Sequence, residues 1–192
     1  AVEADFFGRD VSDFIGVVRS GNTLSAANVG DRRYLGCEAR ARGRLADLLA
    51  FGAGYTFLHG ITSAEDAVPG AAGRAIPNVP AHKLDGRADL TLGPAALFYE
   101  IAWTSDVWLD PRNAGDQKVP GRVLHALGGR VGPWRSVPFA LSVEVRNLAD
   151  LRVLSRELGG VNAGRSSPVP LADFYDYPLP GRSVFVTVAY RP

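Results

Sequence analysis

The fold class is decided by the stretch Tyr34-Leu35-Gly36-Cys37-Glu38-Ala39-Arg40-Ala41-Arg42-Gly43-Arg44-Leu45, in which charged and uncharged residues alternate. Its composition of Glu, Ala, Arg and Leu favours a helix by intrinsic propensity. Its order favours a strand. Charges at every second position would scatter around a helix, whereas at the 180° period of a strand they share one face. The stretch is therefore predicted to be a β-strand with one charged face and one apolar face.

The same alternation recurs along the chain and predicts eight strands in all. They span residues 1–19, 23–45, 48–59, 82–92, 95–107, 119–131, 138–148 and 181–191. The range 119–131 fits poorly, because His125 has the same parity as Val123, Leu127 and Val131. A bulge at Gly128-Gly129 would reset the register there, and the sequence leaves that choice open.

The composition is that of a folded chain. The chain has 192 residues, which corresponds to one domain or slightly more. Hydrophobic residues make up 46% and charged residues 21%, values that exclude a disordered tail. Lys and Arg number 21 against 20 Asp and Glu, so no charge excess favours nucleic acid as a partner. The single cysteine excludes a disulfide framework. There is no Met and the chain opens on Ala1, so we expect a piece of a longer chain.

The connections between the predicted strands are sorted by length. Short turns at Ala46-Asp47, Gly93-Pro94 and Gly132-Pro133 alternate with the longer segments 60–81, 108–118 and 149–180, while Ser20-Gly21-Asn22 closes the first hairpin. The longest uncharged apolar run has eleven residues, fewer than the ~20 that a membrane-spanning helix needs. A spanning β-strand needs only about 10. Sorted connections, alternating strands and the aromatic residues Trp108, Tyr55, Phe57 and Trp134 near strand ends are typical of an outer-membrane β-barrel.

Four segments resemble the barrel of TonB-dependent outer-membrane receptors. The ending Tyr177-Pro178-Leu179-Pro180-Gly181-Arg182-Ser183-Val184-Phe185-Val186-Thr187-Val188-Ala189-Tyr190 resembles the closing strand of that family. Val143-Glu144-Val145-Arg146-Asn147-Leu148-Ala149-Asp150 is similar to a strand that ends in an Asn-Leu-x-Asp turn. Asn28-Val29-Gly30 with Gly36-Cys37-Glu38 resembles a mid-barrel motif, and Pro77-Asn78-Val79-Pro80-Ala81-His82-Lys83 a loop-to-strand entry. The four occur in the family's order over essentially the whole chain.

This resemblance implies a fold, a location and a function. The fold would be all-β, an antiparallel transmembrane barrel of about 22 strands closed by an N-terminal plug. Residues 1–192 would form its last eight strands. The implied function is active uptake of a scarce, bulky nutrient such as an iron–siderophore complex or a cobalamin-like compound. The implied partners are the protein's own plug domain, the TonB complex, the metal chelate and the lipid of the outer membrane of a Gram-negative bacterium.

The charged face has two open interpretations, a wet lumen that contacts the plug or a mutually neutralised interior. Its residues are Glu38, Arg40, Arg42, Arg44, Lys83, Asp85, Arg87, Asp89, Glu144 and Arg146. Loops on a rigid barrel are where ligand binding is usually built. Arginines and aromatics would suit an anionic or aromatic chelate. The candidate ligand-binding residues are Arg112, Asn113, Lys118, Arg165, Tyr175 and Tyr177, with ordinary solvated loops as the alternative.

The sequence contains no catalytic constellation and calls for no cofactor. Gly52-Ala53-Gly54 lacks the third glycine and the helix of a dinucleotide loop, and is interpreted as small residues on a crowded strand face. His59 and His82 flank the segment 60–81, and a metal site there would need Glu65 or Asp66 as well. Two rim histidines facing water are the favoured interpretation. Cys37 is expected to pack inertly on the lipid face.

Two other functions remain open at this point. One is an autonomous eight-stranded outer-membrane barrel whose interior is filled by side chains. The other is a soluble lipocalin-like barrel that binds a ligand, in which the apolar face points inward. Alternation alone fits either polarity.

The sorted connections predict the orientation of the barrel. We expect the segments 60–81 and 149–180 to face outside, and Ala46-Asp47 and Gly93-Pro94 to face the periplasm. Single cysteines introduced at positions 70 and 94 test this by labelling of intact cells with an impermeant thiol reagent. Labelling at position 70 and not at position 94 is expected, and the opposite pattern would reverse the orientation.

Overall fold

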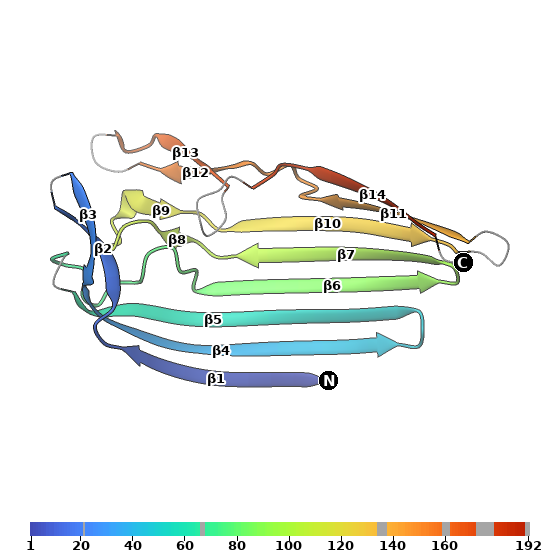
Figure 1. Ribbon diagram of the computed structural model, residues 1–192, viewed down its shortest axis with the longest axis horizontal. Helices are drawn as coiled ribbons and strands as arrows, with labels where there is room; N and C mark the ends of the chain where they lie inside the picture. Colours follow the sequence, from blue (N-terminus) through green and yellow to red (C-terminus); the bar gives the residue numbers. More distant parts are fainter. Residues whose placement is uncertain (21, 66–67, 134–137, 159–161, 172–178, 191–192) are drawn as a thin grey trace.

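The computed structural model shows one antiparallel sheet of eight strands with three small hairpins at one end (Figure 1). It describes residues 1–20, 22–65, 68–133, 138–158, 162–171 and 179–190. The strand order in the sheet is β1-β4-β5-β6-β7-β10-β11-β14, so the sheet is a meander in chain order once the hairpin strands are set aside. Every adjacent pair in it is antiparallel. This confirms the predicted all-β class and the number of main strands.

The predicted strands at 1–19 and 23–45 are each divided into two, so that residues 15–20 and 23–28 form a separate hairpin, while the other strand bounds follow the predicted ranges within a few residues at most ends. The strands of the sheet are β1 Val2–Val11, β4 Gly30–Leu45, β5 Leu49–Glu65, β6 His82–Leu92, β7 Ala95–Thr104, β10 Arg122–Val131, β11 Phe139–Arg146 and β14 Ser183–Tyr190. The hairpins are β2 Ile15–Ser20 with β3 Thr23–Asn28, β8 Val107–Trp108 with β9 Lys118–Val119, and β12 Val153–Glu157 with β13 Ser166–Pro170. A 3-10 turn, η1 Gly115–Gln117, precedes β9. The described residues contain no helix that is long and apolar enough to cross a membrane.

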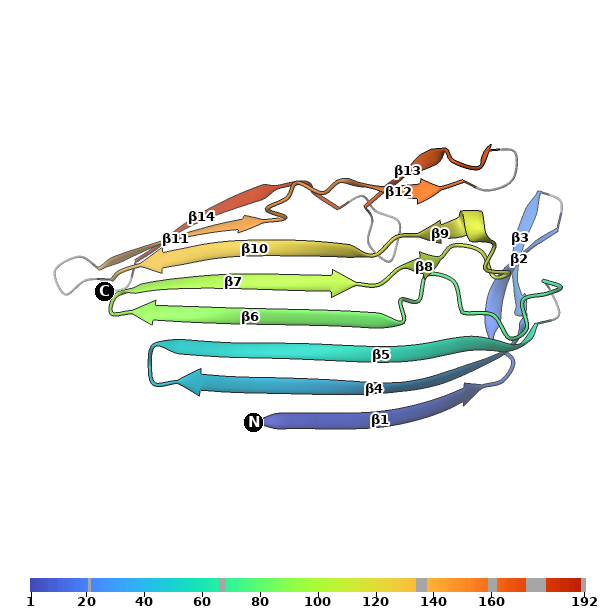
Figure 2. The same cartoon turned by 180° about the vertical axis from the view of Figure 1, so that it is seen from behind.

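The two ends of the sheet differ, as the connections predicted. At one end, here called the turn end, β4 joins β5 and β6 joins β7 through short turns (Figure 1). Gly93 adopts a φ of 58° there, which a residue with a side chain rarely adopts, and Pro94 follows it. The opposite, loop end carries the three hairpins (Figures 1 and 2). β5 runs six residues beyond the predicted end at 59, because Gly60 to Glu65 pair with the start of β4.

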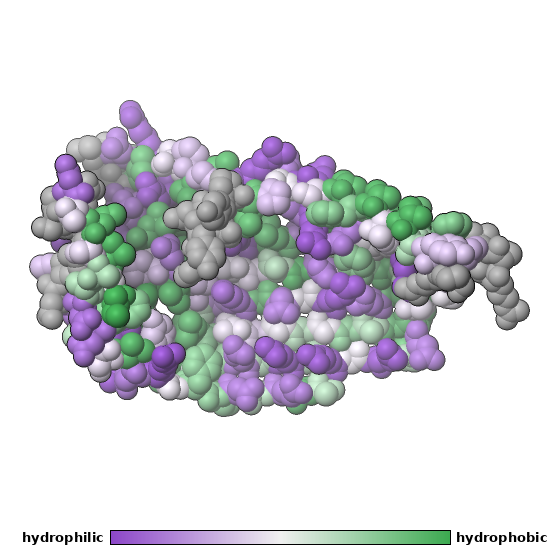
Figure 3. All heavy atoms as spheres, in the orientation of Figure 1, coloured by the Kyte–Doolittle hydropathy of each residue, from purple (hydrophilic) through white to green (hydrophobic). Residues whose placement is uncertain are grey.

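Strand register sorts the side chains onto two faces. One row across the sheet joins Arg42, Gly52, Arg87, Glu100, Ala126, Arg146 and Ser183. The charged residues named from the sequence all have the parity of this row and form what we call the polar face. Figure 3 shows rows of hydrophilic side chains over the strands on this face. Val2, Ala41, Ala53, Gly86 and Ile101 share a row of the opposite, apolar face.

Strand β10 resolves the register that the sequence left open. Its pairing with β7 and with β11 is continuous through Gly128 and Gly129, so there is no bulge. His125 therefore lies on the apolar face, where its Nδ1 is 2.6 Å from the hydroxyl oxygen of Tyr99. The two glycines give room to neighbouring side chains instead. A Cβ atom at Gly128 would lie 2.4 Å from the Phe98 ring.

The sheet is open in the described residues. β1 and β14 are the two edges and do not pair with each other. The apolar face is not covered, since Phe6 is 84% exposed at one edge and Val186 is 65% exposed at the other. A compact apolar cluster lies at the loop end, where Val119, Leu154 and Leu171 pack together with Leu124 and Leu179. The apolar face and the backbone groups of the two edges are therefore left without a covering partner among the described residues.

The face assignment predicts opposite effects of two neighbouring substitutions. Ala41→Arg puts a cation on the apolar face, where a lipid-exposed Arg near the bilayer midplane costs about 2–4 kcal/mol, and we expect it to block assembly into the membrane. Arg42→Leu changes the polar face and should insert normally. The amount of folded, heat-modifiable protein in the outer-membrane fraction measures both. Normal insertion of Ala41→Arg together with failure of Arg42→Leu would invert the faces.

Candidate functional site

Arg87 is the centre of the ionic contacts on the polar face. Its Nη2 atom lies 2.7 Å from Oδ1 of Asp89 on the same strand, and its Nη1 atom pairs with Glu100 of β7. The guanidinium also lies 4.2 Å from the centroid of the Phe98 ring. One arginine thus joins two strands and pairs with two carboxylates.

A second ionic pair lies on β11 in the same row. Arg146 pairs with Glu144 and lies 5.1 Å from the centroid of the Phe185 ring on β14. On β4 the contacts are weaker, because the guanidinium of Arg40 lies 3.7 Å from the carboxylate of Glu38. Arg42 and Arg44 make no ion pair or side-chain hydrogen bond with any residue in the described ranges. On the polar face Arg87 and Arg146 thus have carboxylate partners at hydrogen-bond distance, Arg40 has a more distant one, and Arg42 and Arg44 have none in the described ranges.

A recess of about 540 Å³ lies on the polar face towards the loop end. Its walls are largely apolar and include Ala102, Leu124, Ala126 and Phe185 from the sheet. Leu171 and Leu179, from the segment after β13, line it as well. Arg87, Glu100 and Arg146 lie at its charged side. Leu171 and Leu179 of the long connection between β11 and β14 therefore lie against the polar face rather than the apolar one.

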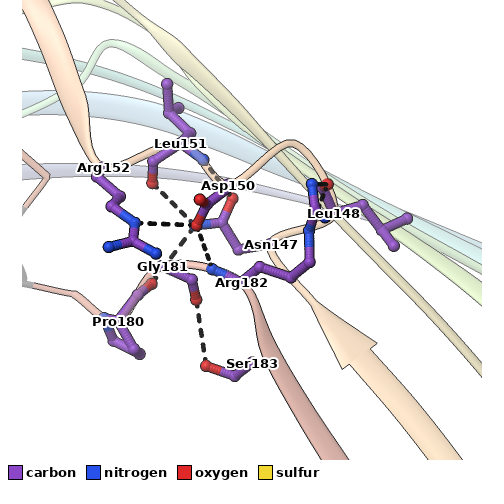
Figure 4. Close-up of polar contacts among 9 residues, drawn as sticks. All are labelled: Asn147, Leu148, Asp150, Leu151, Arg152, Pro180, Gly181, Arg182 and Ser183. Carbon is purple, nitrogen blue, oxygen red and sulfur yellow. Dashed lines mark hydrogen bonds and ion pairs between the residues drawn. The ribbon is translucent and has the colours of Figure 1, made fainter.

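The two ends of that long connection are fastened by a polar clasp, formed by Asn147 and Asp150 after β11 and by Gly181 and Arg182 before β14 (Figure 4). Asn147 accepts a hydrogen bond from the Leu151 amide at 2.9 Å and donates to the Leu151 carbonyl at 2.8 Å. The guanidinium of Arg182 donates to the Leu148 carbonyl at 2.7 Å. Asn147 and Asp150 have φ values of 51° and 53°, a conformation that Asn and Asp tolerate better than most residues.

Asp150 is the charged member of the clasp. Its Oδ1 accepts from the Arg182 amide at 2.7 Å and from Nε of Arg152 at 3.0 Å. The Arg182 amide, followed by the Arg152 guanidinium, lowers the pKa of Asp150 below the ordinary aspartate value. Since the pKa is lowered in the folded state, these contacts contribute at neutral pH and are lost as the pH falls through that lowered pKa. In the sequence these residues carried the family resemblance, and no role was predicted for them.

A family model described as "TonB dependent receptor-like, beta-barrel" matches residues 1–148. The chain belongs to this family. Among curated proteins none matches the chain.

Solved receptors share the fold of this barrel segment at low sequence identity. The siderophore receptor PiuA from Acinetobacter baumannii is 19% identical with a TM-score of 0.67, over 97% of this chain and 25% of its own. The ferric yersiniabactin uptake receptor FyuA from Yersinia pestis is 18% identical with a TM-score of 0.68, over 97% and 27%. The copper transporter OprC is 20% identical with a TM-score of 0.67, over 99% and 28%. The chain thus spans about a quarter of the length of the receptors it resembles.

Two of the candidate ligand residues hold loops of the barrel together. The Asn113 side chain accepts from the Ala75 amide at 2.7 Å and donates to the Ala75 carbonyl at 2.9 Å, as a backbone in a β-bridge would. Nε of Arg112 donates to the Pro69 carbonyl at 3.1 Å. Asp110 accepts from the amides of Ala114 and Arg112, and these bonds lower the pKa of Asp110. The segments 68–81 and 109–117 are therefore joined into one unit.

The remaining candidates lie apart from these. Lys118 pairs with Asp106, and its Nζ is 5.0 Å from the Trp108 ring. Arg165 is exposed next to the start of β13. Tyr175 and Tyr177 lie outside the described residues, as does Trp134. The structure thus brings Arg112, Asn113 and Lys118 to the loop end without gathering all six around one cavity of the described residues.

The histidines of the barrel lie on its apolar face rather than around a metal. Nδ1 of His82 is 2.7 Å from the Tyr55 hydroxyl, and the ring lies 5.2 Å from Phe57 and 6.2 Å from Trp103. His82 is thus part of an aromatic cluster and not a rim residue surrounded by water. Cys37 lies in the row of Phe57 on the same face, as expected. No three His, Cys, Asp or Glu side chains in the described part of the chain lie close enough to hold a metal ion.

The clasp predicts that replacing Gly181 disturbs the contact between Asp150 and Arg152. A Cβ atom there would lie 2.4 Å from Nε of Arg152 and 2.5 Å from Oδ1 of Asp150. Gly181→Ala should therefore displace those two side chains, break the contact between them and lower the urea concentration at the unfolding midpoint. Gly115→Ala is the matched control, since a Cβ atom at Gly115 would meet no other atom within 4 Å. Urea unfolding of the full receptor in lipid vesicles measures both, and equal midpoints would show that the clasp is not needed.

Proposed function

We propose that the chain is the C-terminal part of the barrel of an outer-membrane receptor that takes up a scarce, bulky metal chelate or cobalamin-like compound with energy supplied through TonB. The observation that carries this proposal is the open sheet with a polar face. An eight-stranded segment with two free edges and a charged inner wall is what one part of a large barrel requires. The printed names of its relatives, a siderophore receptor, a copper transporter and a ferric yersiniabactin receptor, support uptake of metal-containing ligands.

The open edges argue against the autonomous eight-stranded barrel. In such a barrel β1 would pair with β14, and inward side chains would fill the interior. Here the two strands lie at opposite sides of the sheet, and the polar face holds a recess of about 540 Å³ (Figure 2). The length of the similar receptors, about four times that of this chain, supports further strands on both edges.

The position of the long connection argues against the lipocalin-like barrel. In that fold the apolar face encloses the ligand. Here Leu171 and Leu179 lie against the polar face, while the apolar residues Val184 and Val188 of β14 are 60% and 66% exposed. An outward apolar face and an inward polar face suit a barrel in lipid.

The loop end is the proposed side of ligand entry, and the polar face the proposed contact with the plug. Arg112 and Asn113 join two loops at this end, so they shape the entrance. The Arg165 side chain is exposed and has no side-chain partner among the described residues, so it can contact a ligand. The ten charged residues of the polar face that the sequence predicted, from Glu38 to Arg146, would contact the plug through the groups that the wall itself leaves unpaired.

Uptake by the full receptor tests this function. Cells that express it are given radioactive iron bound to a hydroxamate, a catecholate or a carboxylate chelator, or radioactive cobalamin, with and without functional TonB. We expect TonB-dependent accumulation of at least one compound, abolished by an uncoupler of the proton gradient.

A separate measurement excludes the possibility that the receptor fails to reach the outer membrane. The same cells are fractionated, and the receptor should be found in the outer membrane in both TonB backgrounds. Accumulation that is equal with and without TonB, from cells with normal receptor levels, would contradict the proposal.

A further inference from the structure

The recess on the polar face differs from the rest of that face because its walls are largely apolar. It has a volume of about 540 Å³ and extends over the strands β6, β7, β10, β11 and β14. Cavities that bind small molecules usually have volumes of about 300–1,000 Å³ and apolar walls, with a few polar groups among them. The recess has this size and this kind of wall.

The floor of the recess contains two alanines on neighbouring strands. Ala102 of β7 stands opposite Leu124 of β10, and Ala126 of β10 stands opposite Glu100 of β7, so the two alanines are diagonal neighbours. Diagonal neighbours in an antiparallel pair lie about 7–8 Å apart. Ala102 is exposed in the recess and Ala126 is buried at its bottom. Two methyl groups between longer side chains thus leave a low strip on which a flat group can lie.

Apolar side chains from distant parts of the chain surround this floor. Leu124 and Phe185 line it from β10 and β14, and Leu179 and Pro180 line it from the connection before β14. Leu179 also packs against the apolar cluster of the loop end, which holds it in place. Aromatic rings pack against one another in offset or edge-to-face arrangements. A ring over the two alanines can therefore pack against the ring of Phe185.

The charged groups that line the recess balance one another. They are two cations and two anions, Arg87, Arg146, Asp85 and Glu100. Arg87 pairs with Glu100, and Arg146 pairs with Glu144. Asp85 has no ion pair among the described residues, but its carboxylate lies towards β5, because a Cβ atom at Gly54 would be 2.7 Å from its Oδ1. The recess therefore offers no unpaired cation to an anionic guest.

The neutral polar side chains of the lining are also occupied. Asn147 accepts from the Leu151 amide and donates to the Leu151 carbonyl, and the Ser183 hydroxyl donates to the Gly181 carbonyl at 3.1 Å. A polar or charged guest would lose its hydrogen bonds to water and find no free partner in their place, which costs free energy. The recess therefore favours an uncharged guest that is mainly apolar.

We propose that the recess binds an uncharged aromatic ring of the compound that the receptor takes up, with the ring over Ala102 and Ala126 and beside Phe185. This inference rests on the proposed function and deepens it, because it names the chemistry that the transported compound presents to the inner wall. A ring in the recess is removed from water and gains contacts with Leu124 and Leu179. The ion pairs at the charged side of the recess stay intact when the ring binds.

The reaction rates of a cysteine in the recess test the site in the full receptor. Ala102→Cys is introduced into a receptor whose other cysteines, Cys37 included, are replaced by serine, and the protein is purified in detergent. Its rates of modification by N-phenylmaleimide and by N-ethylmaleimide are each divided by the rate for glutathione in the same solution. This division removes the intrinsic reactivity of the two reagents and their partition into detergent. The ratio of the two quotients is the aromatic preference of the position.

We expect an aromatic preference of roughly tenfold at position 102, because apolar side chains surround the ring of the phenyl reagent there. Ala50→Cys is the matched control, since this alanine of the same face stands opposite Arg44 and Asp89, and it should show no preference. Benzamide, an uncharged ring, should remove the preference at position 102, whereas benzoate and acetamide should leave it unchanged.

A substitution in the wall connects the preference with the recess. Leu179→Ala removes apolar contacts with the ring and should lower the preference at position 102 by about threefold or more. Leu141→Ala is its control, because Leu141 lies on the apolar face outside the recess, and it should leave the preference unchanged. Both variants are compared as folded, heat-modifiable protein.

Several results would overturn the site. The same preference at positions 50 and 102, or an unchanged preference in Leu179→Ala, would show that the recess does not select a ring. A cysteine at position 102 that reacts with neither reagent would show that another part of the receptor fills the recess. Stronger protection by benzoate than by benzamide would show that the guest is an anion. None of these readouts uses transport, so failed uptake with an aromatic preference contradicts the proposed function alone, and normal uptake without the preference contradicts this inference alone.

Discussion

The two-residue period of a paired strand is the constraint on which the rest of this structure depends. A shift of one residue in any pairing would move a whole set of side chains to the other face. The row that joins Arg42, Arg87 and Arg146 spans seven strands, so an error in one pairing would carry a cation into lipid and an apolar side chain into the lumen. The register is therefore specified by both faces of the sheet at once.

The edge strand β14 needs additional help with its register. Its outward face is a run of small apolar residues, Val184, Val186 and Val188, that would accept a slip along the strand with little loss of burial. The clasp removes this freedom, because Asp150 binds the amide immediately before the strand and Arg182 binds the Leu148 carbonyl two residues beyond the end of β11. Hydrogen bonds at the start of β14 thus define the register that its side chains leave weakly determined.

The main strands were predictable because their signal is local. Alternation within a single strand identified eight strands and both faces, and the short turns at Ala46 and Gly93 defined one end. The hairpin β12–β13 was not predicted, because Pro168 and Pro170 argue against a strand, and they are tolerated here in a two-stranded edge hairpin. The extension of β5 to Glu65 was missed for a different reason, since it depends on pairing with residues of β4 that lie 26 to 35 positions earlier in the chain.

The site was harder to predict than the fold, because charge partners are a property of pairing across strands. From the sequence, Arg42 and Arg87 look alike, each an arginine between small or apolar neighbours. What separates them is the residue opposite. Arg87 stands opposite Glu100 and two residues from Asp89, whereas Arg42 stands opposite Gly52 on one side and the start of β1 on the other.

Such a difference follows from how charge is distributed over a barrel wall. A barrel wall whose charges were all paired with one another would present no charge pattern that favours one luminal segment over another. A wall with every charge unpaired would be costly until it was filled. In this segment Arg87 and Arg146 pair with carboxylates of the wall, whereas Arg42 and Arg44 on β4 stand opposite Gly52 and Ala50. The ion pairs are solvent-exposed, so they determine which side chains lie together more than they stabilise the wall.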